Sequence, residues 1–189
     1  MVTVFRLGHR IFRDKRVTTH LALVARAFGS VGIRIAGETD ENIIKSVSKV
    51  VSEWGGDFSI EFLPYEDWPQ FLEDWKQKKG KIIHLTMYGE NIQNFQSNEQ
   101  FKMFRSSREA LKQLLVIVGG EKVPAKVFYY ADWNVAITNQ PHSEVGSLAI
   151  FLEKLIPNSL EINFPNSKRK IKPSVEGKKT YFNESESDE

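Results

Sequence analysis

The segment QLLVIVGG, residues 113–120, decides the fold class because it places a short, uninterrupted apolar run directly before two glycines. Such a run is typical of a strand buried on both faces of a parallel sheet, and KIIHLTM at 81–87 repeats the pattern. Segments with helical periodicity separate the strands. Apolar residues between Ile43 and Trp54 recur every 3.6 residues, for example, after the capping residue Asp40. About six strands that alternate with helices predict an α/β fold with a mainly parallel sheet and helices on both faces.

The expected elements divide the chain into a large domain and a short extension. Strands are predicted at 2–7, 32–36, 57–62, 81–87, 113–120 and 133–137. A helix is predicted to begin at Thr18 or Thr19 and to end at Gly29, and the last helix to begin near Ser143. After Pro157, the segments SLEINF, PNS and KRKIKP predict an antiparallel hairpin. We therefore expect a domain over 1–157, a β-hairpin extension over 158–182 and a disordered acidic tail over 183–189.

The composition limits the classes of protein and of site. The 189 residues contain no cysteine, which excludes disulfides, thiolate zinc ligands and cysteine nucleophiles. The four histidines show no metal-ligand spacing, so we expect no metal site. The charge of Arg6 comes too early for a signal peptide, and no apolar run reaches the roughly 20 residues of a membrane span. A cytoplasmic protein without a membrane segment is the expectation.

Three predicted strand ends carry features that suit a ligand, because ligands of open α/β sheets bind at the carboxyl ends of strands. Gly119 and Gly120 follow one buried strand, where glycine lets the backbone approach a ligand, although a tight turn is the plainer interpretation. AITNQPHSEVGS at 136–147 is dense in polar groups, of which an ordinary helix cap at Ser143 explains only part. HLTMYG at 84–89 is the third, and its His84 is more often a satisfied core histidine than a ligand.

The basic stretch RLGHRIFRDKRVTTH, residues 6–20, contains five cations and two histidines but a single acid, Asp14. We expect its cations to lie in the loop after the first strand. Because only Asp14 is at hand to neutralise them, an anionic partner is the simplest explanation, and arginine suits phosphate. A second basic cluster, SKRKIK at 167–172, favours a polyanion, and the lack of obvious stacking platforms favours a folded RNA read by its shape.

The residues that carry a family resemblance are RLGHRIFRDKRVTTH, the WGG at Trp54, HLTMYG, VGGEKVP and ADWNVAITNQPHSEVGSLAIFLEKL. In this order they resemble the archaeal tRNA (cytidine-56)-2'-O-methyltransferases, a branch of the SPOUT superfamily, over residues 1 to about 156. The resemblance implies a SPOUT-type fold with a deep trefoil knot in its C-terminal half, followed by a β-hairpin. It also implies a homodimer that uses S-adenosyl-L-methionine to methylate the ribose 2'-hydroxyl of cytidine 56 in the tRNA T-loop.

The resemblance further implies which residues bind and which react. In this superfamily three knot loops hold the cofactor, and the matching residues here are Leu85, Val118, Gly119, Gly120, Glu121, Lys122, Ala136, Ile137, Thr138, Asn139, Gln140, Pro141, His142 and Ser143. The arginine of the superfamily's first motif would fall on Leu23, so its role must pass to the preceding basic stretch. We expect Arg16 first for catalysis, then Arg10 and Arg13, with His142 and Glu144 as helpers.

Other functions stay open at this point. One is a SPOUT methyltransferase that acts on another RNA nucleotide, and a second is a non-catalytic RNA-binding module that kept a vacant cofactor loop. A third is an enzyme for a phosphate metabolite with a simple doubly wound fold.

Ribose methylation requires that an electrophilic methyl group be aligned with a hydroxyl whose proton is taken up or whose anion is stabilised.

Overall fold

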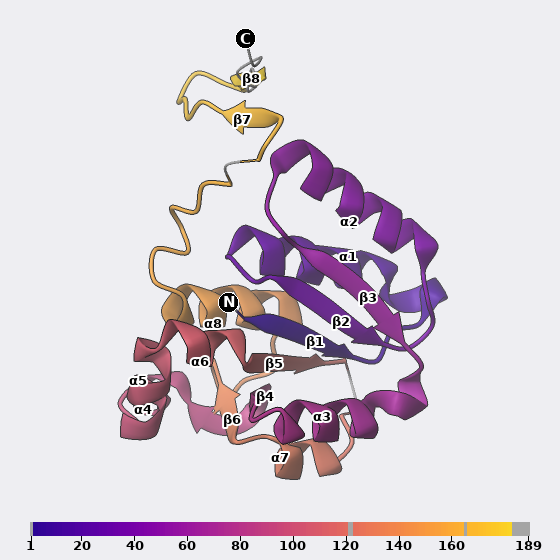
Figure 1. The fold of residues 1–189 in the computed structure, drawn as a ribbon, viewed down its shortest axis with the longest axis vertical. Coiled ribbons are helices and arrows are strands. Elements are labelled where there is room, and N and C mark those ends of the chain that lie inside the picture. The colour runs from indigo at the N-terminus through magenta and orange to yellow at the C-terminus, as the bar shows by residue number, and fades with distance from the viewer. Residues whose placement is uncertain (1, 121–122, 165, 183–189) are drawn as a thin grey trace.

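The computed structural model describes residues 2–120, 123–164 and 166–182, and these form a six-stranded sheet in which all neighbouring strands run parallel (Figure 1). The order along the sheet is β3-β2-β1-β5-β4-β6. The bounds are β1 Thr3–Leu7, β2 Gly32–Ala36, β3 Ser59–Leu63, β4 Lys81–Asn91, β5 Leu114–Gly119 and β6 Trp133–Ala136. The six predicted strands correspond to these six, and the prediction of an α/β fold with a mainly parallel sheet is confirmed.

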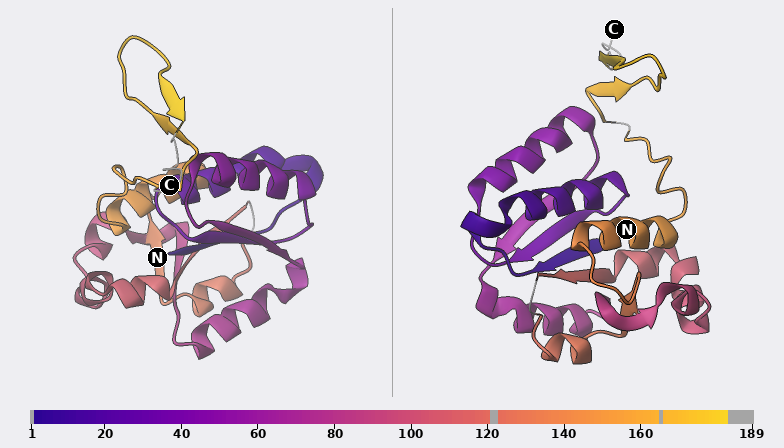
Figure 2. Two further views of the ribbon diagram at one scale, coloured as in Figure 1. Left: turned by 45° about the horizontal axis from the view of Figure 1, so that its top comes forward. Right: turned by 180° about the vertical axis from the view of Figure 1, so that it is seen from behind.

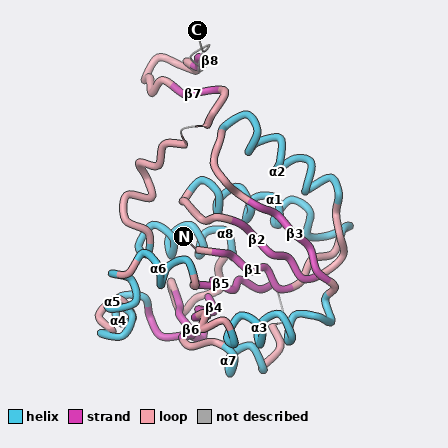
Figure 3. The backbone as a smooth tube through the Cα atoms, in the orientation of Figure 1, coloured by secondary structure: helices cyan, strands magenta, loops and turns pink. Residues whose placement is uncertain are grey.

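Helices cover both faces of the sheet, as Figures 2 and 3 show. One face packs against α1 Ile11–Ala27, α2 Glu41–Trp54 and α8 Glu144–Leu155, and the other against α3 Trp68–Gln77 and α7 Lys126–Tyr130. A short 3-10 turn precedes α3, and β4 is joined to β5 through α4 Ile92–Phe95, α5 Glu99–Ser106 and α6 Arg108–Lys112. None of the helices in the described part of the chain is both long and apolar enough to cross a membrane.

Strand β1 lies in the middle of the sheet, and its side chains alternate between the two apolar cores. Val4 packs in the core under α1 and α8, whereas Phe5 and Leu7 pack in the core under α3 and α7. This alternation turns Arg6 toward the α1 and α8 side. Arg6 is 1% exposed and pairs in register with Ile35 of β2 and Val118 of β5, so a charged side chain starts from the centre of the sheet.

The start of α1 corrects the sequence analysis. The helix begins at Ile11, so the prediction of a start at Thr18 or Thr19 after a basic loop is wrong. The stabilising contacts explain the error, because the Ile11 N–H donates to the Glu38 carboxylate 27 residues away, at 2.7 Å. The carboxylate of Asp14 accepts the Arg10 N–H at 3.1 Å. An acceptor brought in by tertiary structure leaves no local capping signal.

The C-terminal extension contains a hairpin, but its strands differ from the predicted ones. β7 Arg169–Ile171 pairs antiparallel with β8 Thr180–Phe182, and the predicted strand SLEINF at 159–164 is not a strand. Its side chains anchor the chain to the domain instead, with Phe164 lying 4.4 Å from the guanidinium of Arg26. The guanidinium in turn donates to the carbonyl groups of Trp54 and Gly55. The predicted acidic tail, 183–189, lies outside the described residues.

The hairpin leaves the domain at the amino-terminal edge of the sheet (Figure 1). The Lys168 N–H donates at 3.0 Å to the carbonyl of Glu53, which lies in the last turn of α2. Since α2 leads into β3, this end of the helix lies at the edge of the sheet where β3 begins. The predicted basic clusters therefore lie at opposite edges of the sheet in one chain. The cluster at 167–172 belongs to the hairpin, whereas the basic stretch around Arg13 follows the carboxyl end of β1.

Candidate functional site

A cleft of about 1550 Å³ lies at the carboxyl edge of the sheet. The segments that follow β1, β2, β3 and β5 contribute to its walls, as do residues 84–88 within β4 and the segment before α8. The lining residues in chain order are Leu7–Arg10, Arg13, Asp14, Val17, Gly37–Thr39, Pro64–Glu66, His84–Tyr88, Gly119, Gly120, Val123, Phe128, Pro141, His142, Glu144 and Ser147. This is the edge at which open parallel sheets bind ligands.

The structure brings the three predicted cofactor loops together in this cleft. Leu85 lines it from the middle of β4, Gly119 and Gly120 line it from the end of β5, and Pro141 and His142 line it from the segment before α8. Glu121 and Lys122, also predicted to bind the cofactor, lie outside the described residues. Segments separated by more than 50 residues in the sequence thus share one cavity, as the resemblance implied.

The remaining predicted cofactor residues do not line the cleft. Val118 and Ala136 are buried within their strands. Ser143 caps α8 through its hydroxyl oxygen, which accepts the Val145 N–H at 3.2 Å. The predicted residues that are likewise absent from the lining are Ile137, Thr138, Asn139 and Gln140.

Asn139 nevertheless connects two of the loops. Its side-chain N–H donates to the carbonyl of Met87 at 2.7 Å and to that of Gly89 at 3.2 Å. These carbonyls belong to the far part of β4, so Asn139 holds the segment before α8 against the segment that contributes Leu85 to the cleft. Asn139 therefore stabilises the wall of the cleft without lining it.

The two glycines at the end of β5 differ in the space around them. A Cβ on Gly119 would collide with the side chain of Val123, whereas a Cβ on Gly120 would meet no atom within 4 Å. Gly119 is therefore required for the backbone to pass close to Val123. Gly120 leaves its backbone open at the cleft, where a ligand can approach it.

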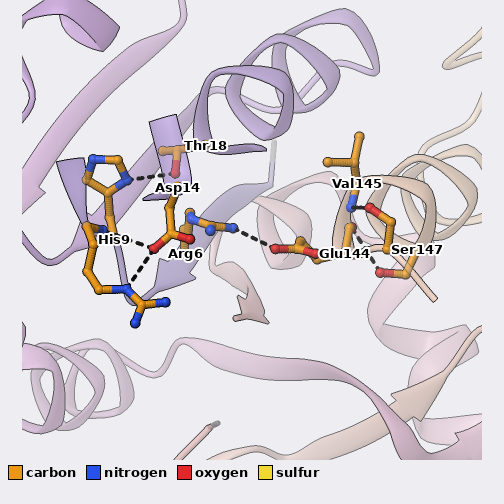
Figure 4. A network of polar contacts seen from close by, with 9 residues as sticks. Arg6, His9, Asp14, Thr18, Glu144, Val145 and Ser147 are labelled. Carbon is orange, nitrogen blue, oxygen red and sulfur yellow. Dashed lines mark hydrogen bonds and ion pairs between the residues drawn. The ribbon is translucent and has the colours of Figure 1, made fainter. Parts of the chain in front are cut away.

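A buried ion pair joins the centre of the sheet to the cleft (Figure 4). The guanidinium of Arg6 lies 3.2 Å from the carboxylate of Glu144, with the two side chains 2% and 26% exposed. Glu144 stands in the first turn of α8 and lines the cleft, where a negative charge also suits the helix dipole. The premise that only Asp14 neutralises the basic stretch is thus wrong, since Glu144, 138 residues away from Arg6, takes one of its charges.

His9 is held neutral in the cleft wall. Its Nδ1 lies 2.9 Å from the hydroxyl of Thr18, and the residue is 2% exposed. Burial lowers its pKa below the ordinary 6.5, and the charge of Arg6 lowers it further, against the opposing effect of Asp40, Asp14 and Glu38. His84 is also buried and lines the cleft, and burial lowers its pKa as well, against a hydrogen bond to Asn134.

The three predicted catalytic arginines occupy different positions along the start of α1. Arg10 lines the cleft and pairs with Asp14 at 3.2 Å, and Arg13 lines the cleft one turn further on. Arg16 is exposed and lies outside the cleft lining in the single chain. Beside it, Phe12 is fully exposed, four residues earlier on the same side of the helix.

The lining carries more negative than positive groups among the described residues. It includes the carboxylates of Asp14, Glu38, Glu66 and Glu144 against the guanidinium groups of Arg10 and Arg13. No cluster of three metal-ligating side chains occurs in the described ranges. The segments Gly37–Thr39 and Pro64–Glu66 were missed by the sequence analysis, although the rule that ligands bind at strand ends applies to IAGETD and FLPYED as well.

Comparison with known proteins identifies the family. Residues 54–181 match the Trm56 family, described as tRNA ribose 2'-O-methyltransferase, aTrm56. A tRNA (cytidine(56)-2'-O)-methyltransferase of Thermococcus kodakarensis is 49% identical over 180 residues, which cover 95% of this chain and 96% of that protein. The chain belongs to this family. The protein of the same name from Methanocaldococcus jannaschii is also 49% identical, with 94% of each chain covered.

Solved structures support the same fold for this Trm56 family member. An RNA 2'-O ribose methyltransferase aligns with a TM-score of 0.57 at 17% identity, covering 84% of this chain and 56% of that one. The SpoU methyltransferase AviRb from Streptomyces viridochromogenes, solved in complex with the cofactor AdoMet, aligns with a TM-score of 0.54 at 13% identity. That alignment covers 85% of this chain and 58% of AviRb. The predicted SPOUT resemblance is therefore confirmed at the level of family and fold.

The two buried histidines predict a stability that depends on pH. In the fold their pKa values lie below 6.5, so the unfolded chain binds more protons near that pH. The contribution of the two neutral histidines to the free energy of unfolding is fully present above pH 6.5. It is lost as the pH falls, by up to about 1.4 kcal/mol per pH unit for each histidine. Urea unfolding followed by tryptophan fluorescence at pH values of about 7.5 and about 5.5 measures this loss.

The exposed His20 provides the matched control for that measurement. His20→Gln should leave the difference in unfolding free energy between the two pH values unchanged, whereas His84→Asn should reduce it. Equal unfolding free energies of the unsubstituted protein at both pH values would contradict the assignment of neutral buried histidines.

Proposed function

We propose that this chain transfers a methyl group from S-adenosyl-L-methionine to the ribose 2'-hydroxyl of cytidine 56 in tRNA. The observation that carries the proposal is the convergence of three strand-end loops on one cleft in a member of the Trm56 family. The named activity of relatives at 49% identity over nearly the whole chain supports the nucleotide and the position. Acting on another RNA nucleotide is the alternative that this similarity disfavours.

The described residues of the cleft fit S-adenosyl-L-methionine in charge. Asp14 and Glu144 are paired with Arg10 and Arg6, so Glu38 and Glu66 are the carboxylates that would suit the cationic sulfonium and ammonium groups of this ligand. A phosphate metabolite would meet the same two carboxylates, which disfavours the metabolite enzyme considered from the sequence. Leu85, Gly119 and Gly120 would hold the cofactor on one side and Pro141 and His142 on the other, and when bound it supplies an electrophilic methyl group.

The chain's own residues then have to position the ribose and handle the hydroxyl proton. A 2'-hydroxyl becomes a better nucleophile when a positive group stabilises the developing oxyanion or a base takes its proton. Arg16 of a second subunit is the first candidate for the positive group, and Arg13 can add to it from within the cleft. His142 and Glu144 are candidate proton acceptors there. Arg6 holds the Glu144 carboxylate in a fixed position through their ion pair. His9 is neutral and adds no charge to the cleft wall.

We include a homodimer and a trefoil knot in the proposal. Arg16 lies outside the cleft lining of its own chain, so its predicted catalytic role requires the cleft of a second subunit. The fully exposed Phe12, together with Ile11 at 36% exposure, gives this side of α1 an apolar surface that a second subunit would cover. The knotted C-terminal half is proposed from the family resemblance alone.

The tRNA would contact cations at both edges of the sheet. Lys15 and Arg16 are exposed on α1 near the cleft, whereas Arg169, Lys170 and Lys172 belong to the hairpin region at the opposite edge. Phosphate contacts at such sites position an RNA without reading its bases. In a dimer, the hairpin of one subunit can complement the cleft of the other, so that a folded RNA spans both. A non-catalytic module would use the same cations but leave the cleft without cofactor.

The proposed reaction predicts a single methyl group at a defined nucleotide. Incubation of the purified protein with S-adenosyl-L-methionine and an unmodified tRNA transcript should add one methyl group, and mass spectrometry of nuclease fragments should place it on cytidine 56. A transcript with 2'-deoxycytidine at this position removes the acceptor and should receive no methyl group. Methylation of the deoxy transcript, or of another nucleotide, would contradict the proposal. Calorimetric titration with the cofactor alone separates a vacant RNA-binding module, which would give no heat.

The second prediction concerns Arg16. Arg16→Ala should lower kcat by roughly 100-fold or more, the usual effect of removing one group that stabilises an oxyanion. Cofactor affinity measured by calorimetry should stay within about twofold, because the proposed partner of Arg16 is the ribose oxygen of the tRNA and not the cofactor. Lys15→Ala is the matched control, since Lys15 is the neighbouring exposed cation, and its kcat should change little.

Mixed subunits test the arrangement directly. If Arg16 acts across the dimer, mixing Arg16→Ala chains with chains whose cleft is blocked by Gly120→Trp should restore about a quarter to a half of the activity, through dimers with one complete site. Retained activity of Arg16→Ala would remove Arg16 from the mechanism.

A further inference from the structure

His84 combines burial, a fixed ring orientation and a place in the cleft wall. It precedes Leu85 on β4, is only 1% exposed, and lines the cleft. The ring meets Phe128 of the α7 segment edge to face, with centroids 4.9 Å apart and an interplanar angle of 90°. The imidazole therefore belongs to the α3 and α7 side of the sheet.

The contacts of Asn134 determine which nitrogen of His84 carries the proton. The Asn134 side-chain N–H donates to the carbonyl of Phe128 at 3.1 Å, which leaves its amide oxygen facing His84. That oxygen lies 2.9 Å from Nδ1 of His84 and can only accept a hydrogen bond, so Nδ1 must be the donor. Burial lowers the pKa of His84 and keeps the ring neutral. In this tautomer Nε2 presents a lone pair.

Nε2 of His84 is a buried acceptor without a donor among the described residues. Because Nδ1 is taken by Asn134 on the neighbouring strand, Nε2 is the ring nitrogen that a ligand in the cleft would reach, after a small displacement of the atoms that cover it. Buried polar atoms in native proteins normally have a partner, so an orphaned acceptor in a cleft wall points to a ligand that donates a hydrogen bond.

We propose that Nε2 of His84 accepts a hydrogen bond from the exocyclic amino group of the purine of S-adenosyl-L-methionine, an inference that rests on the proposed function. The surroundings favour a neutral donor, because Phe128 packs against this ring and the apolar Val123 lines the cleft on the same side of the sheet. An uncharged aromatic base with an N–H group satisfies such a wall without burying a charge.

The cationic ammonium of the same ligand is drawn elsewhere. Glu38 follows β2, which is three strand spacings from β4, a distance of about 14 Å. Glu66 follows β3, one strand further away, and Glu144 belongs to α8 on the opposite face of the sheet. These three carboxylates lie away from His84, and Asp14 is paired with Arg10 on α1, so a neutral group is the donor that suits Nε2. Of the neutral donors in the ligand, the purine amino group fits this wall better than a ribose hydroxyl, because the flat base can pack beside the ring of Phe128.

The tautomer makes this contact selective. A purine with a carbonyl oxygen in place of the amino group would place an acceptor against the lone pair of Nε2, and neither atom would have a hydrogen to share. Asn134 is therefore a positioning residue, since it sets the tautomer through His84 Nδ1 without lining the cleft itself.

Calorimetry with S-adenosylhomocysteine and S-inosylhomocysteine tests the contact. The two probes differ at the purine amino group, which the inosyl compound replaces with a carbonyl oxygen. The unsubstituted protein should prefer the adenosyl compound by at least about tenfold, the usual worth of one buried hydrogen bond. In His84→Phe this preference should fall by about tenfold, because the adenosyl compound loses its acceptor. His20→Phe, the same substitution at an exposed position, should keep the original preference.

The possible outcomes separate this inference from the proposed function. If His84→Phe keeps the original preference and still methylates tRNA, the contact is refuted while the function stands. If the unsubstituted protein binds neither probe, both are refuted.

Nitrogen-15 spectra of the unsubstituted protein give a readout that does not depend on folding of the variant. They should show a protonated Nδ1 and an unprotonated Nε2 in His84, with the Nε2 resonance moving when S-adenosylhomocysteine binds. A Nε2 resonance that stays in place on saturation with S-adenosylhomocysteine would overturn the inference.

Discussion

The ion pair between Arg6 and Glu144 is the interaction on which the shape of the cleft depends. Arg6 starts from the central strand, is 1% exposed, and reaches the first turn of α8 at 3.2 Å. A buried pair adds little net stability because desolvation offsets the attraction, but loss of one partner costs about 3–5 kcal/mol. Its effect is therefore on geometry. It fixes the start of α8, and with it the segment containing His142, against the end of β1.

Much of the fold follows from local patterns in the sequence. QLLVIVGG and KIIHLTM are buried on both faces as parallel strands, and Ile43, Val47 and Val51 form the inner side of α2 after the Asp40 cap. A parallel sheet brings the carboxyl ends of its strands to one edge. The strand-end rule therefore singled out the three segments, and the family resemblance implied that Leu85, Gly119 and His142 within them share one site.

The errors occur where the decisive contact is distant in the sequence. Helix α1 begins at Ile11 because Glu38 accepts its N–H, and the charge of Arg6 is compensated by Glu144. The segment at 159–164 has the alternation of a strand, but Phe164 packs on Arg26 instead of joining a sheet. Neither the acidic wall of the cleft nor the tautomer of His84 could be predicted from the sequence, because each depends on residues that only the fold brings together.

The central claim is that the middle of β4 and the loops after β5 and before α8 hold one methyl donor in the cleft. Hydrogen–deuterium exchange with and without S-adenosyl-L-methionine tests this claim most directly. We expect slower exchange on binding in peptides that cover 84–89, 117–124 and 136–147 together, with the hairpin at 169–182 unchanged. Protection confined to one of these segments, or located at the opposite edge of the sheet, would contradict the account.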